Sequence, residues 1–411
     1  MKSVCILLQN HYEFDIRVRR KAETLVAAGY SVDVLALRSP HAQKTYTLNG
    51  VRVCSLSLGK QRGSLPRYAF EYVAFFLWAL VRLTIRIPWR RYDVIDVNTL
   101  PDFLVFAAVF AKWTGAKVIL DMHEITPEFY MSKYGITKNS WWVRLLERIE
   151  KISFDFADHV ITINEPIQDL LAGRGLPPAK STVITNAADE ARFVSYSRSS
   201  AADAAAVPGT FVMMYHGTLT KLYGLDLAIE AFAMVHEEMP GAELWILGQG
   251  PEVSLLKALV QQRGLGSKVR LVGVILPNEI PAWLSKCDVG ILPIRRDVFL
   301  EFASPNKLAE YIIMGKAVVI SRLKTIRHYF SEDAFAYCAP NDPAELAKQM
   351  VRVYGDSGLR ARLAARAKRE YAPISWNVMK QRYLRLMQDI VVPVRQRAET
   401  SPTAETTGLS R

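Results

Sequence analysis

Cysteine is scarce in this chain, and its scarcity excludes two classes of protein. Four cysteines occur among 411 residues, at Cys5, Cys54, Cys287 and Cys338, without a Cys-x-x-Cys pair and without clustering with histidine. Small disulfide scaffolds and zinc sites are therefore excluded. Each cysteine lies in or beside an apolar run, so we expect buried thiols that pack as small hydrophobic side chains in a reducing compartment.

Long hydrophobic runs are absent as well. The opening run, Val4 to Leu8, is too short for a secretory signal and no small-residue cleavage site follows it, so we expect no export. The most hydrophobic segment, Tyr68 to Ile87, has its longest uncharged run between Tyr72 and Val81, whereas a bilayer span needs roughly 18 to 20 apolar residues. The sequence therefore predicts no transmembrane helix, although an interfacial helix is compatible with it.

Several signatures of common binding sites are missing. The loop after the first apolar run reads Gln9-Asn10-His11-Tyr12-Glu13-Phe14-Asp15 in place of Gly-x-Gly-x-x-Gly, which counts against NAD or FAD. His123-Glu124 is followed by Ile125-Thr126-Pro127, so a zinc-protease site is not supported. The formal net charge of +12 comes without a helix-turn-helix, zinc-finger or RNP-like motif, so we expect no nucleic-acid partner.

The composition is that of a folded protein, and the chain is too long for a single core. Half of the residues are hydrophobic and 22% are charged, which is typical of globular domains. A length of 411 residues favours two domains of roughly 150 to 200 residues each. Short β-rich runs alternate with helical patterns, as in parallel sheets covered by helices. We expect seven strands between Val4 and Thr185 and six between Phe211 and Cys338.

A change of texture marks the domain boundary. Residues 195–209 are small and polar, as in a linker. We predict an α/β fold with two doubly wound Rossmann-like domains at 1–192 and 210–375, joined by a linker at 193–209. A closing helix at 376–391 should pack back toward the first domain, and a disordered tail should fill 392–411. Such sheets bind ligands beyond the carboxyl ends of their strands, so the site should lie between the domains.

The most informative stretch begins at Ser304. Ser304 suits an N-cap, Pro305 suits the first helical position, and Gly315 suits the position just past the helix end. The unpaired N–H groups at this helix start, the helix dipole and Lys307 form an anion site that suits a diphosphate. Glu310 lies one turn further in, where a carboxylate can accept hydrogen bonds from vicinal ribose hydroxyls. The alternative is an ordinary capped helix with a solvated glutamate.

This stretch resembles the nucleotide-binding helix of the retaining glycosyltransferases of family 4, which have the GT-B fold of two facing Rossmann-like domains. Five other segments resemble that family in the same order, so the resemblance spans roughly residues 1 to 390. They are Asp15–Val32 in the first helix and second strand, Asp121–Glu128, Thr185–Asp189, Tyr215–Asp226 at the start of the second domain, and the Gly-x-Gly-Pro loop at Leu247–Glu252. The resemblance implies metal-independent transfer from a nucleotide diphosphate sugar, which is a substrate, with no cofactor.

The resemblance also implies roles for single residues. His123, which follows an expected strand directly, would contact the donor sugar near the reacting carbon; a hydrogen-bonded structural histidine is the alternative. His123 and Glu310 would be the catalytic pair, and no residue would bind a metal. The donor-binding set would be Gly217, Thr218, Lys221, Gly248, Gly250, Ser304, Asn306, Lys307, Leu308 and Glu310.

One departure from the family pattern concerns a carboxylate. The family usually has two glutamates eight positions apart, and counting back from Glu310 gives Phe302. Glu301 is one residue out of phase, and it could serve only if the loop before Ser304 differs in conformation. The role of the first glutamate therefore stays unassigned.

A second departure concerns the cations of the family's second-domain loop. The arginine and lysine that many members carry after the loop glycine correspond here to Thr218 and Tyr223. A diphosphate in a desolvated cleft needs a charge-assisted donor. Lys221 or Lys307 is left to supply it.

Part of the positive charge surrounds the most hydrophobic segment. Seven lysines or arginines, Arg82, Arg86, Arg90 and Arg91 among them, lie between residues 60 and 91 against one acid, Glu71. They flank the aromatic-rich segment Tyr68–Ile87, which suits an interfacial helix on anionic lipid. The alternative is a core helix with solvated charged ends.

Together these observations favour a retaining glycosyltransferase that moves a sugar from a nucleotide diphosphate donor to a hydroxyl of a glycan or lipid-linked acceptor, in polysaccharide or glycolipid biosynthesis. We expect it in the cytoplasm, peripheral on the inner face of the membrane. Two alternatives stay open. A nucleotide-sugar epimerase on the same fold would not transfer sugar to an added acceptor, and a nucleotide-sugar-binding protein without turnover would fit the unassigned first glutamate.

Overall fold

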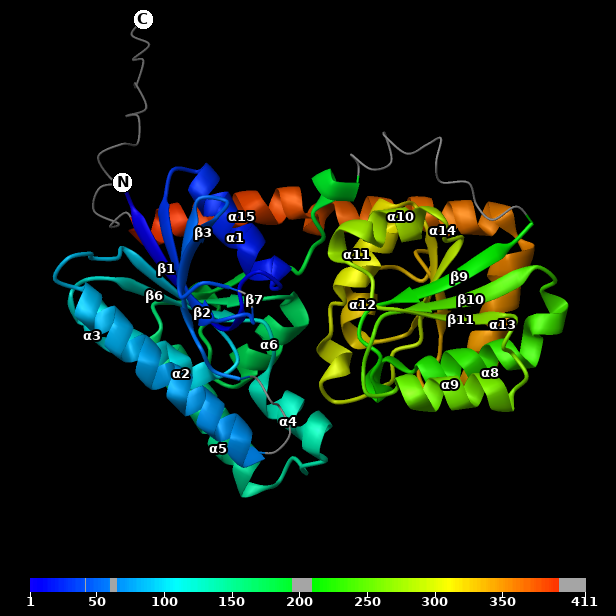
Figure 1. Cartoon of the computed structure of the whole chain (residues 1–411), viewed down its shortest axis with the longest axis horizontal. Helices are drawn as coiled ribbons and strands as arrows, with labels where there is room; N and C mark the ends of the chain where they lie inside the picture. The colour runs from blue at the N-terminus through cyan, green and yellow to red at the C-terminus, as the bar shows by residue number, and fades with distance from the viewer. Residues whose placement is uncertain (41, 60–64, 194–208, 392–411) are drawn as a thin grey trace, which may run out of the picture.

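The chain forms two α/β domains that lie side by side (Figure 1). The structure is a computed structural model and describes residues 1–40, 42–59, 65–193 and 209–391. The predicted disordered tail and nearly all of the predicted linker lie outside the described residues. Each domain is built on a mostly parallel sheet, so the prediction of two doubly wound domains is confirmed.

The first sheet has eight strands in the order β3-β4-β2-β1-β5-β6-β7-β8, and all neighbours are parallel except β3 and β4. Its strands are β1 Ser3–His11, β2 Ser31–Leu37, β3 Thr45–Leu48, β4 Val51–Leu56, β5 Val94–Asn98, β6 Lys117–Met122, β7 His159–Thr162 and β8 Ser181–Val183. The sequence analysis did not predict β3, an exposed edge strand. Asn49 and Gly50 join it to β4 with positive φ at both positions, as in a tight hairpin turn.

Helices cover both faces of this sheet, because successive side chains of a strand point to opposite faces. Val4 and Ile6 pack toward α1 and α15, whereas Cys5 and Leu7 pack toward α2, η1, α3 and α5. The first-domain helices are α1 Ile16–Ala27, α2 Leu65–Arg86, η1 Asp102–Ala108, α3 Val109–Trp113, α4 Thr126–Tyr134, α5 Trp141–Phe156, α6 Glu165–Gly173 and η2 Pro178–Lys180. The sequence analysis missed α4, whose first turn contains Pro127.

The second sheet has six parallel strands in the order β11-β10-β9-β12-β13-β14. They are β9 Phe211–His216, β10 Ala242–Leu247, β11 Val269–Gly273, β12 Val289–Leu292, β13 Ala317–Ser321 and β14 Ala336–Cys338. The surrounding helices are η3 Lys221–Tyr223, α8 Leu225–Val235, η4 His236–Glu238, α9 Val253–Gln262, η5 Pro277–Glu279, α10 Ile280–Ser285, η6 Leu300–Phe302, α11 Asn306–Ile313, α12 Lys324–Tyr329, α13 Pro343–Gly355, α14 Ser357–Tyr371 and η7 Ala372–Ile374. The six-residue α12 was not predicted.

The last described helix, α15 (Trp376–Val391), leaves the second domain and packs on the first sheet (Figure 1). Its Tyr383 hydroxyl donates a hydrogen bond of 3.0 Å to Asp96 Oδ2 on β5. The Arg20 guanidinium lies 4.0 Å from the centre of the Trp376 ring. These contacts join α15 to β5 and α1 of the first domain. The helix therefore connects the two domains on one side.

Helix α2 is long and apolar enough to cross a membrane by length and composition, over Pro66–Arg86, with a mean hydropathy of 1.4. The sequence analysis predicted no spanning helix because of the charges in this segment, and composition alone does not support that exclusion. However, Phe75, Ala79 and Leu83 pack in the core of the first domain. In this fold α2 therefore covers the sheet, while a large part of its surface stays exposed.

All four cysteines are free and buried, as their apolar surroundings predicted. Burial raises the pKa of the Cys287 and Cys338 thiols to about 12. A thiolate is the reactive form of cysteine, so these side chains are chemically quiet.

Candidate functional site

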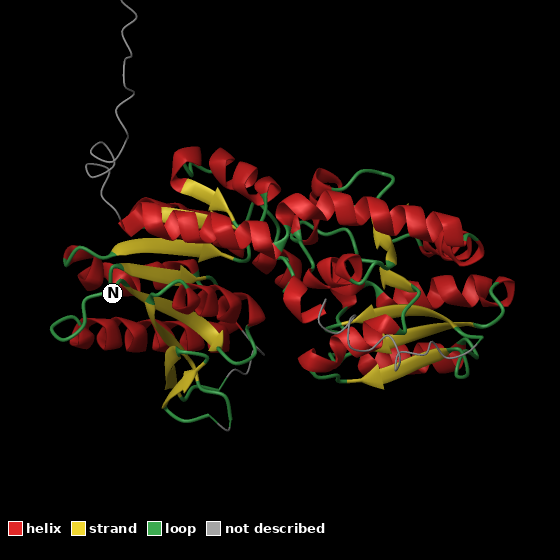
Figure 2. Ribbon diagram, turned by 90° about the horizontal axis from the view of Figure 1, so that it is seen from above, coloured by secondary structure: helices red, strands yellow, loops and turns green. Residues whose placement is uncertain are grey.

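The carboxyl ends of the two sheets point toward each other across the gap between the domains (Figure 2). His123 follows the last residue of β6, and His216 is the last residue of β9. Across the gap, Glu124 and Arg17 of the first domain act electrostatically on the Tyr223 phenol of the second. Side chains of both domains therefore come close to one another at the carboxyl ends of the two sheets.

On the second-domain side, the site is built around the start of α11. The helix begins at Asn306, and Pro305 is its N-cap, with extended backbone and no side-chain cap. The prediction of Ser304 as N-cap and Pro305 as first helical residue was therefore wrong. The Ser304 hydroxyl instead accepts a hydrogen bond of 3.2 Å from Asn164 Nδ2 of the first domain. Gly315 follows the helix with φ of 67°, as predicted.

Lys307 lies at the centre of this half of the site. Its Nζ is 2.8 Å from the Tyr215 hydroxyl, 4.3 Å from the centre of the Tyr215 ring and 3.8 Å from that of Tyr223. Aromatic faces attract a cation, but burial lowers the pKa of Lys307 to about 7, against a smaller opposing effect of Glu310. The ammonium is thus poorly hydrated and well placed to meet an anion.

The glycine loops bring the backbone close to this lysine. A Cβ at Gly217 would lie 3.0 Å from Lys307 Nζ, and a Cβ at Gly248 would lie 1.8 Å from the Gly217 carbonyl oxygen. A Cβ at Gly250 would lie 2.1 Å from the Leu219 carbonyl oxygen. The three predicted glycines therefore form one tightly packed wall beside Lys307. The Gly217 N–H donates to the Leu247 carbonyl, so that donor is occupied.

The two candidate cations, Lys221 and Lys307, lie in different surroundings. Lys221 is exposed on the short helix η3, and its carbonyl oxygen accepts a hydrogen bond from Arg295 Nε. Thr218 is exposed as well, and its carbonyl accepts from the Tyr215 hydroxyl. Lys307 Nζ, by contrast, rests on the ring of Tyr223, the residue at the family's lysine position.

Glu310 belongs to a hydrogen-bonded chain through His216. Its Oε2 is 2.6 Å from His216 Nε2, and His216 Nδ1 is 3.0 Å from the Tyr311 hydroxyl. That hydroxyl donates to the Met214 carbonyl, so it accepts from Nδ1–H. The contact with His216 thus orients Glu310 through Oε2.

The other predicted donor-binding residues of α11 lie on different faces of that helix. Asn306 is exposed in the first turn. Leu308 is buried, and it lines a cavity between the domains with Thr185 and Tyr329. The structure therefore brings Lys307, Gly217 and Gly248 together, while Leu308 packs toward the first domain.

On the first-domain side, His123 is buried at 4% exposure. Its Nε2 is 2.8 Å from Asn98 Oδ1 and 3.4 Å from Asp121 Oδ2, so Nε2 carries the proton. Burial lowers the pKa of His123 and so favours the neutral ring. The negative charge of Asp121 opposes this shift but does not reverse it. Among the described residues Nδ1 has no hydrogen-bond partner. It is therefore a buried acceptor without a protein donor.

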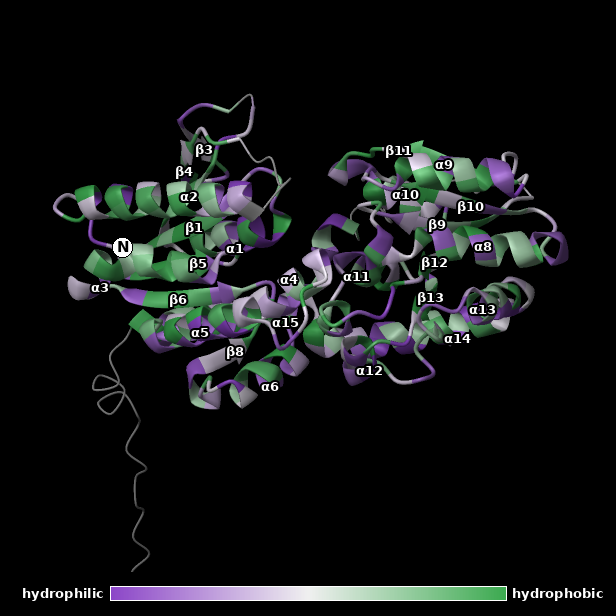
Figure 3. Ribbon diagram, turned by 90° about the horizontal axis from the view of Figure 1, so that it is seen from below, coloured by the Kyte–Doolittle hydropathy of each residue, from purple (hydrophilic) through white to green (hydrophobic). Residues whose placement is uncertain are grey.

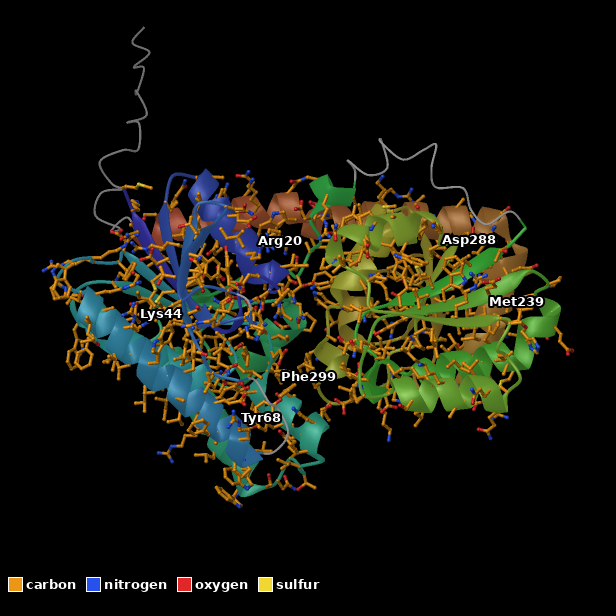
Figure 4. The ribbon with its side chains drawn as sticks, viewed as in Figure 1. Arg20, Lys44, Tyr68, Met239, Asp288 and Phe299 are labelled. Atoms are coloured by element: carbon orange, nitrogen blue, oxygen red, sulfur yellow. The ribbon has the colours of Figure 1, made fainter. Side chains whose placement is uncertain are left out.

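Beside His123 the first domain has a pocket. Its lining includes Gln9, Asp15, Arg17, Tyr68 and Glu124. Gln9 is 5% exposed, and its Nε2 has no hydrogen-bond partner within the described part of the chain. Figure 4 shows Tyr68 on the first-domain side of the lower gap, with Phe299 of the second domain nearby. The pocket offers polar groups suited to a hydroxyl-rich ligand.

Glu301 does not reach this site. Its Oε1 is 2.6 Å from Arg296 Nε, and its Oε2 accepts a hydrogen bond of 2.7 Å from the Lys324 N–H at the start of α12. Both carboxylate oxygens are therefore engaged, and the first-glutamate role stays unassigned. In the described ranges, no group of three or more His, Cys, Asp or Glu could hold a metal ion.

Three residues of the site received no role from the sequence: His216, Tyr215 and Gln9. His216 ends a strand next to a loop glycine, which is the same rule that selected His123. Tyr215 reads as the last residue of a strand, and Gln9 as the first residue of a loop, although Gln9 belongs to β1. Only the spatial neighbours of these side chains, Lys307 and the pocket, reveal them.

Comparison with known protein families covers most of the chain. Residues 15–187 match the family described as "Glycosyl transferase 4-like domain", and residues 210–356 match "Glycosyl transferases group 1". Among curated relatives, the probable glycosyltransferase WbjE of Pseudomonas aeruginosa is 26% identical over 292 residues, which are 69% of this chain and 71% of WbjE.

Solved structures share the fold. Sucrose-phosphate synthase of Thermosynechococcus elongatus is 18% identical, with a TM-score of 0.73 over 98% of this chain and 100% of that one. Anabaena HepE, solved with UDP, is 17% identical, with a TM-score of 0.68 over 95% and 100%. WaaG, a glycosyltransferase involved in lipopolysaccharide biosynthesis, is 15% identical, with a TM-score of 0.68 over 93% and 98%.

Proposed function

Because this chain belongs to the family 4-like GT-B glycosyltransferases, we propose that it moves a sugar from a nucleotide diphosphate donor to a hydroxyl of a glycan or lipid-linked acceptor, with retention of configuration. The observation that carries the donor assignment is the seat of Lys307, between Tyr215 and Tyr223 and against Gly217. Within the described residues no carboxylate is in hydrogen-bond contact with this ammonium, so it suits an anionic ligand. Two further relatives favour a role in polysaccharide or lipopolysaccharide synthesis: the putative colanic acid biosynthesis glycosyltransferase WcaL of Escherichia coli, and the lipopolysaccharide core biosynthesis glycosyltransferase LpsE of Rhizobium meliloti.

The donor's diphosphate would lie on the start of α11. Lys307 Nζ and the first N–H groups of the helix supply positive charge to the phosphate oxygens. Glu310, held by His216, accepts the ribose hydroxyls through its other oxygen. HepE was solved with UDP, so a UDP-sugar is the first donor to test.

In the reaction the bond between the anomeric carbon and the diphosphate breaks. The acceptor oxygen bonds to the same carbon from the same face, and its proton passes to the departing phosphate oxygen. Negative charge grows on the diphosphate, where Lys307 and the helix N–H groups stabilise it. His123 Nδ1 accepts a hydrogen bond from a sugar hydroxyl and so fixes the sugar near the acceptor. These protein groups carry the charge, so the proposed reaction needs no metal ion.

The acceptor would enter from the first domain. The pocket beside His123 offers the unpaired amide of Gln9 together with Asp15 and Glu124. These groups suit several hydroxyls of a sugar. A glycan or a lipid-linked sugar therefore fits this side of the site, and its biosynthetic role agrees with a cytoplasmic location.

A panel of nucleotide sugars tests this proposal in a thermal-shift assay. A bound donor stabilises the folded chain by roughly 2.7 kcal/mol at a hundredfold excess over Kd, so one base and sugar should stand out. No stabilisation by any member would contradict the donor assignment. Sugar transfer to an added glycan then separates a transferase from an epimerase, and single-turnover hydrolysis separates it from a binding protein.

A further inference from the structure

The exposed tryptophans of this protein gather on one face. Trp89, Trp113, Trp141 and Trp142 are between 49% and 81% exposed, and the other described tryptophans are more buried. Twelve of the 21 exposed large hydrophobic residues belong to the same part of the chain: Phe70, Val73, Leu77, Val81, Ile85, Trp89, Phe110, Trp113, Trp141, Trp142, Leu145 and Ile152. We call this set the apolar face. Exposed apolar residues that gather on one face mark an interaction site.

The apolar face lies on three helical segments that run side by side. Seen from below, α2, α3 and α5 lie next to one another on the outside of the first domain (Figure 3). Phe76 of α2 packs against Phe103 of η1 at 5.8 Å, and Phe106 of η1 packs against Phe156 of α5 at 5.1 Å. The segments are thereby held together from within, so their outer residues form one surface.

Three of the four arginines at and after the end of α2 are not available to this surface, contrary to the sequence hypothesis, whereas Arg91 is exposed. Arg86 and Arg90 pair with the buried carboxylate of Asp33 at 3.6 Å and 3.2 Å. Arg82 Nη2 lies 3.2 Å from the sulfur of Cys54. These side chains hold the first domain together, so reversing their charge would damage the fold.

Exposed positive charge is found on α5 instead. Arg144 and Arg148 are exposed without a salt bridge among the described residues, and the exposed Lys151 pairs with Asp155 at 3.7 Å. They alternate with the exposed apolar residues Leu145 and Ile152. The helix start is fixed, because Ser140 Oγ accepts from the Val143 N–H at 3.3 Å. The stacked rings of Trp141 and Trp142, 3.9 Å apart, stand at that end. Tryptophans and cations beside an apolar stripe are the composition of an interfacial helix.

We propose that the apolar face docks on a bilayer that contains anionic lipid, with Trp141 and Trp142 at headgroup depth and Arg144, Arg148 and Lys151 on the lipid phosphates. A second copy of the chain fits less well, because pairing this face with itself would bring Arg144 and Arg148 of the two copies together, while Asp155 on the same helix is already paired with Lys151. An anionic surface neutralises these arginines.

Docking in this orientation also sets where the acceptor pocket lies relative to the membrane. This part of the inference rests on the proposed function. Tyr68 and Tyr72, in the first turns of α2, line that pocket, while Phe70 and Val73 between and beside them are exposed on the apolar face. The pocket therefore opens at the end of the face that touches the membrane. A membrane-borne acceptor would reach it without leaving the bilayer.

Vesicle sedimentation of the full chain tests the docking. The probes are vesicles of phosphatidylcholine alone and of phosphatidylcholine with phosphatidylglycerol, at about 0.1 M and about 1 M salt, where the Debye length falls from about 10 Å to about 3 Å. We expect binding to the acidic vesicles at low salt and release at high salt. Protein that stays in the supernatant with acidic vesicles, or binds neutral vesicles equally well, overturns the proposal.

Charge variants locate the contact. Arg144→Glu with Arg148→Glu should lower partitioning into acidic vesicles at least about tenfold. Lys368→Glu with Arg369→Glu, exposed on α14 of the second domain, changes the net charge equally and should leave partitioning unchanged. Equal losses in both variants overturn the assignment of the face.

Two further measurements separate the other outcomes. If the chain sediments as a dimer without lipid and Leu77→Ser with Val81→Ser makes it monomeric, a second copy covers the face and the bilayer proposal is wrong. Nucleotide-sugar affinity is measured on the same α5 variant and should stay unchanged. If vesicle binding is lost while donor binding stays intact, the result bears only on the docking. If the parent protein does not bind the donor, the result contradicts only the proposed function.

Discussion

At the scale of single residues, Lys307 shows how surroundings change a side chain. The same lysine on the surface would be charged at any physiological pH, but here two tyrosine rings replace water around it. Burial lowers its pKa to about 7. A lysine with this pKa becomes a cation fully only when an anion arrives, so binding of the donor should take up a proton.

The first prediction follows from that linkage. Between pH 6 and pH 9 the affinity for the nucleotide sugar should fall, because the free lysine loses its charge as the pH rises through about 7. A nucleotide sugar is the right ligand, since its diphosphate does not titrate in this range. Calorimetry on Lys307→Arg, which keeps its charge at all these pH values, should show a flat profile; a parallel fall in both proteins contradicts the role of Lys307.

Glu310 leads to a second prediction. Glu310→Ala should weaken binding of the nucleoside diphosphate by roughly 1.5 to 3 kcal/mol, the range for hydrogen bonds to a charged group. His216→Ala removes the group that orients this carboxylate, at 2.6 Å, without removing the carboxylate itself. We expect a smaller loss from it. Unchanged affinity in Glu310→Ala, measured by calorimetry, would refute the ribose contact.

His123 leads to a third prediction, about turnover. His123→Ala should lower kcat about 100-fold, because the sugar loses its position near the acceptor, while affinity for the free nucleoside diphosphate stays nearly constant. The ring also bonds Asn98, so thermal melting must show that the variant is folded. Parent-level turnover in a folded variant would leave His123 as a structural residue.

At the scale of secondary-structure elements, most strands and helices could be predicted, because long runs with a clear period carry their own signal. The missed elements include α4, which has nine residues and Pro127 in its first turn, and two shorter ones. The edge strand β3 has four residues, and α12 has six. Their stability comes from neighbours, such as the Thr325 hydroxyl that donates to the Glu301 carbonyl. The Asn49-Gly50 pair was a readable hairpin signal, whereas nothing local marked α12.

The start of α11 shows the limit of local capping rules. Ser304 has the right residue type for an N-cap, but Asn164 of the other domain takes its hydroxyl. A contact across 140 residues cannot be read from a local pattern. The helix itself was nevertheless predicted at the right place, because Gly315 keeps its position after the helix whichever residue caps its start.

The loops between these elements give the fourth prediction. Gly248→Ala should cost about 3 kcal/mol or more, because its Cβ would lie 1.8 Å from the Gly217 carbonyl at a φ of 135°. Strain from positive φ alone is about 1 to 2 kcal/mol. Gly264→Ala is the matched control, with φ of 68° and no atom within 4 Å of the added Cβ. Equal melting temperatures for the two variants would contradict the close packing of this wall.

At the scale of the whole molecule, the sequence indicated two domains and a site between them, and it could not place the domains relative to each other. That placement depends on side-chain contacts between distant segments. Asn164 Nδ2 donates to the Phe302 carbonyl at 2.9 Å, and Phe129 packs on Phe299 at 5.6 Å. Arg86 at the end of α2 and Arg90 after it show the same difference between pattern and structure, because their partner Asp33 lies on strand β2.

The central claim is retaining transfer from a nucleotide diphosphate sugar in the cleft between the domains. Proton NMR of the reaction mixture tests it most directly, with the donor selected by thermal shift, a glycan acceptor, and EDTA to remove free metal ions. We predict release of the nucleoside diphosphate in step with a product whose anomeric configuration equals that of the donor. An inverted product, or no release of nucleoside diphosphate, would contradict the account.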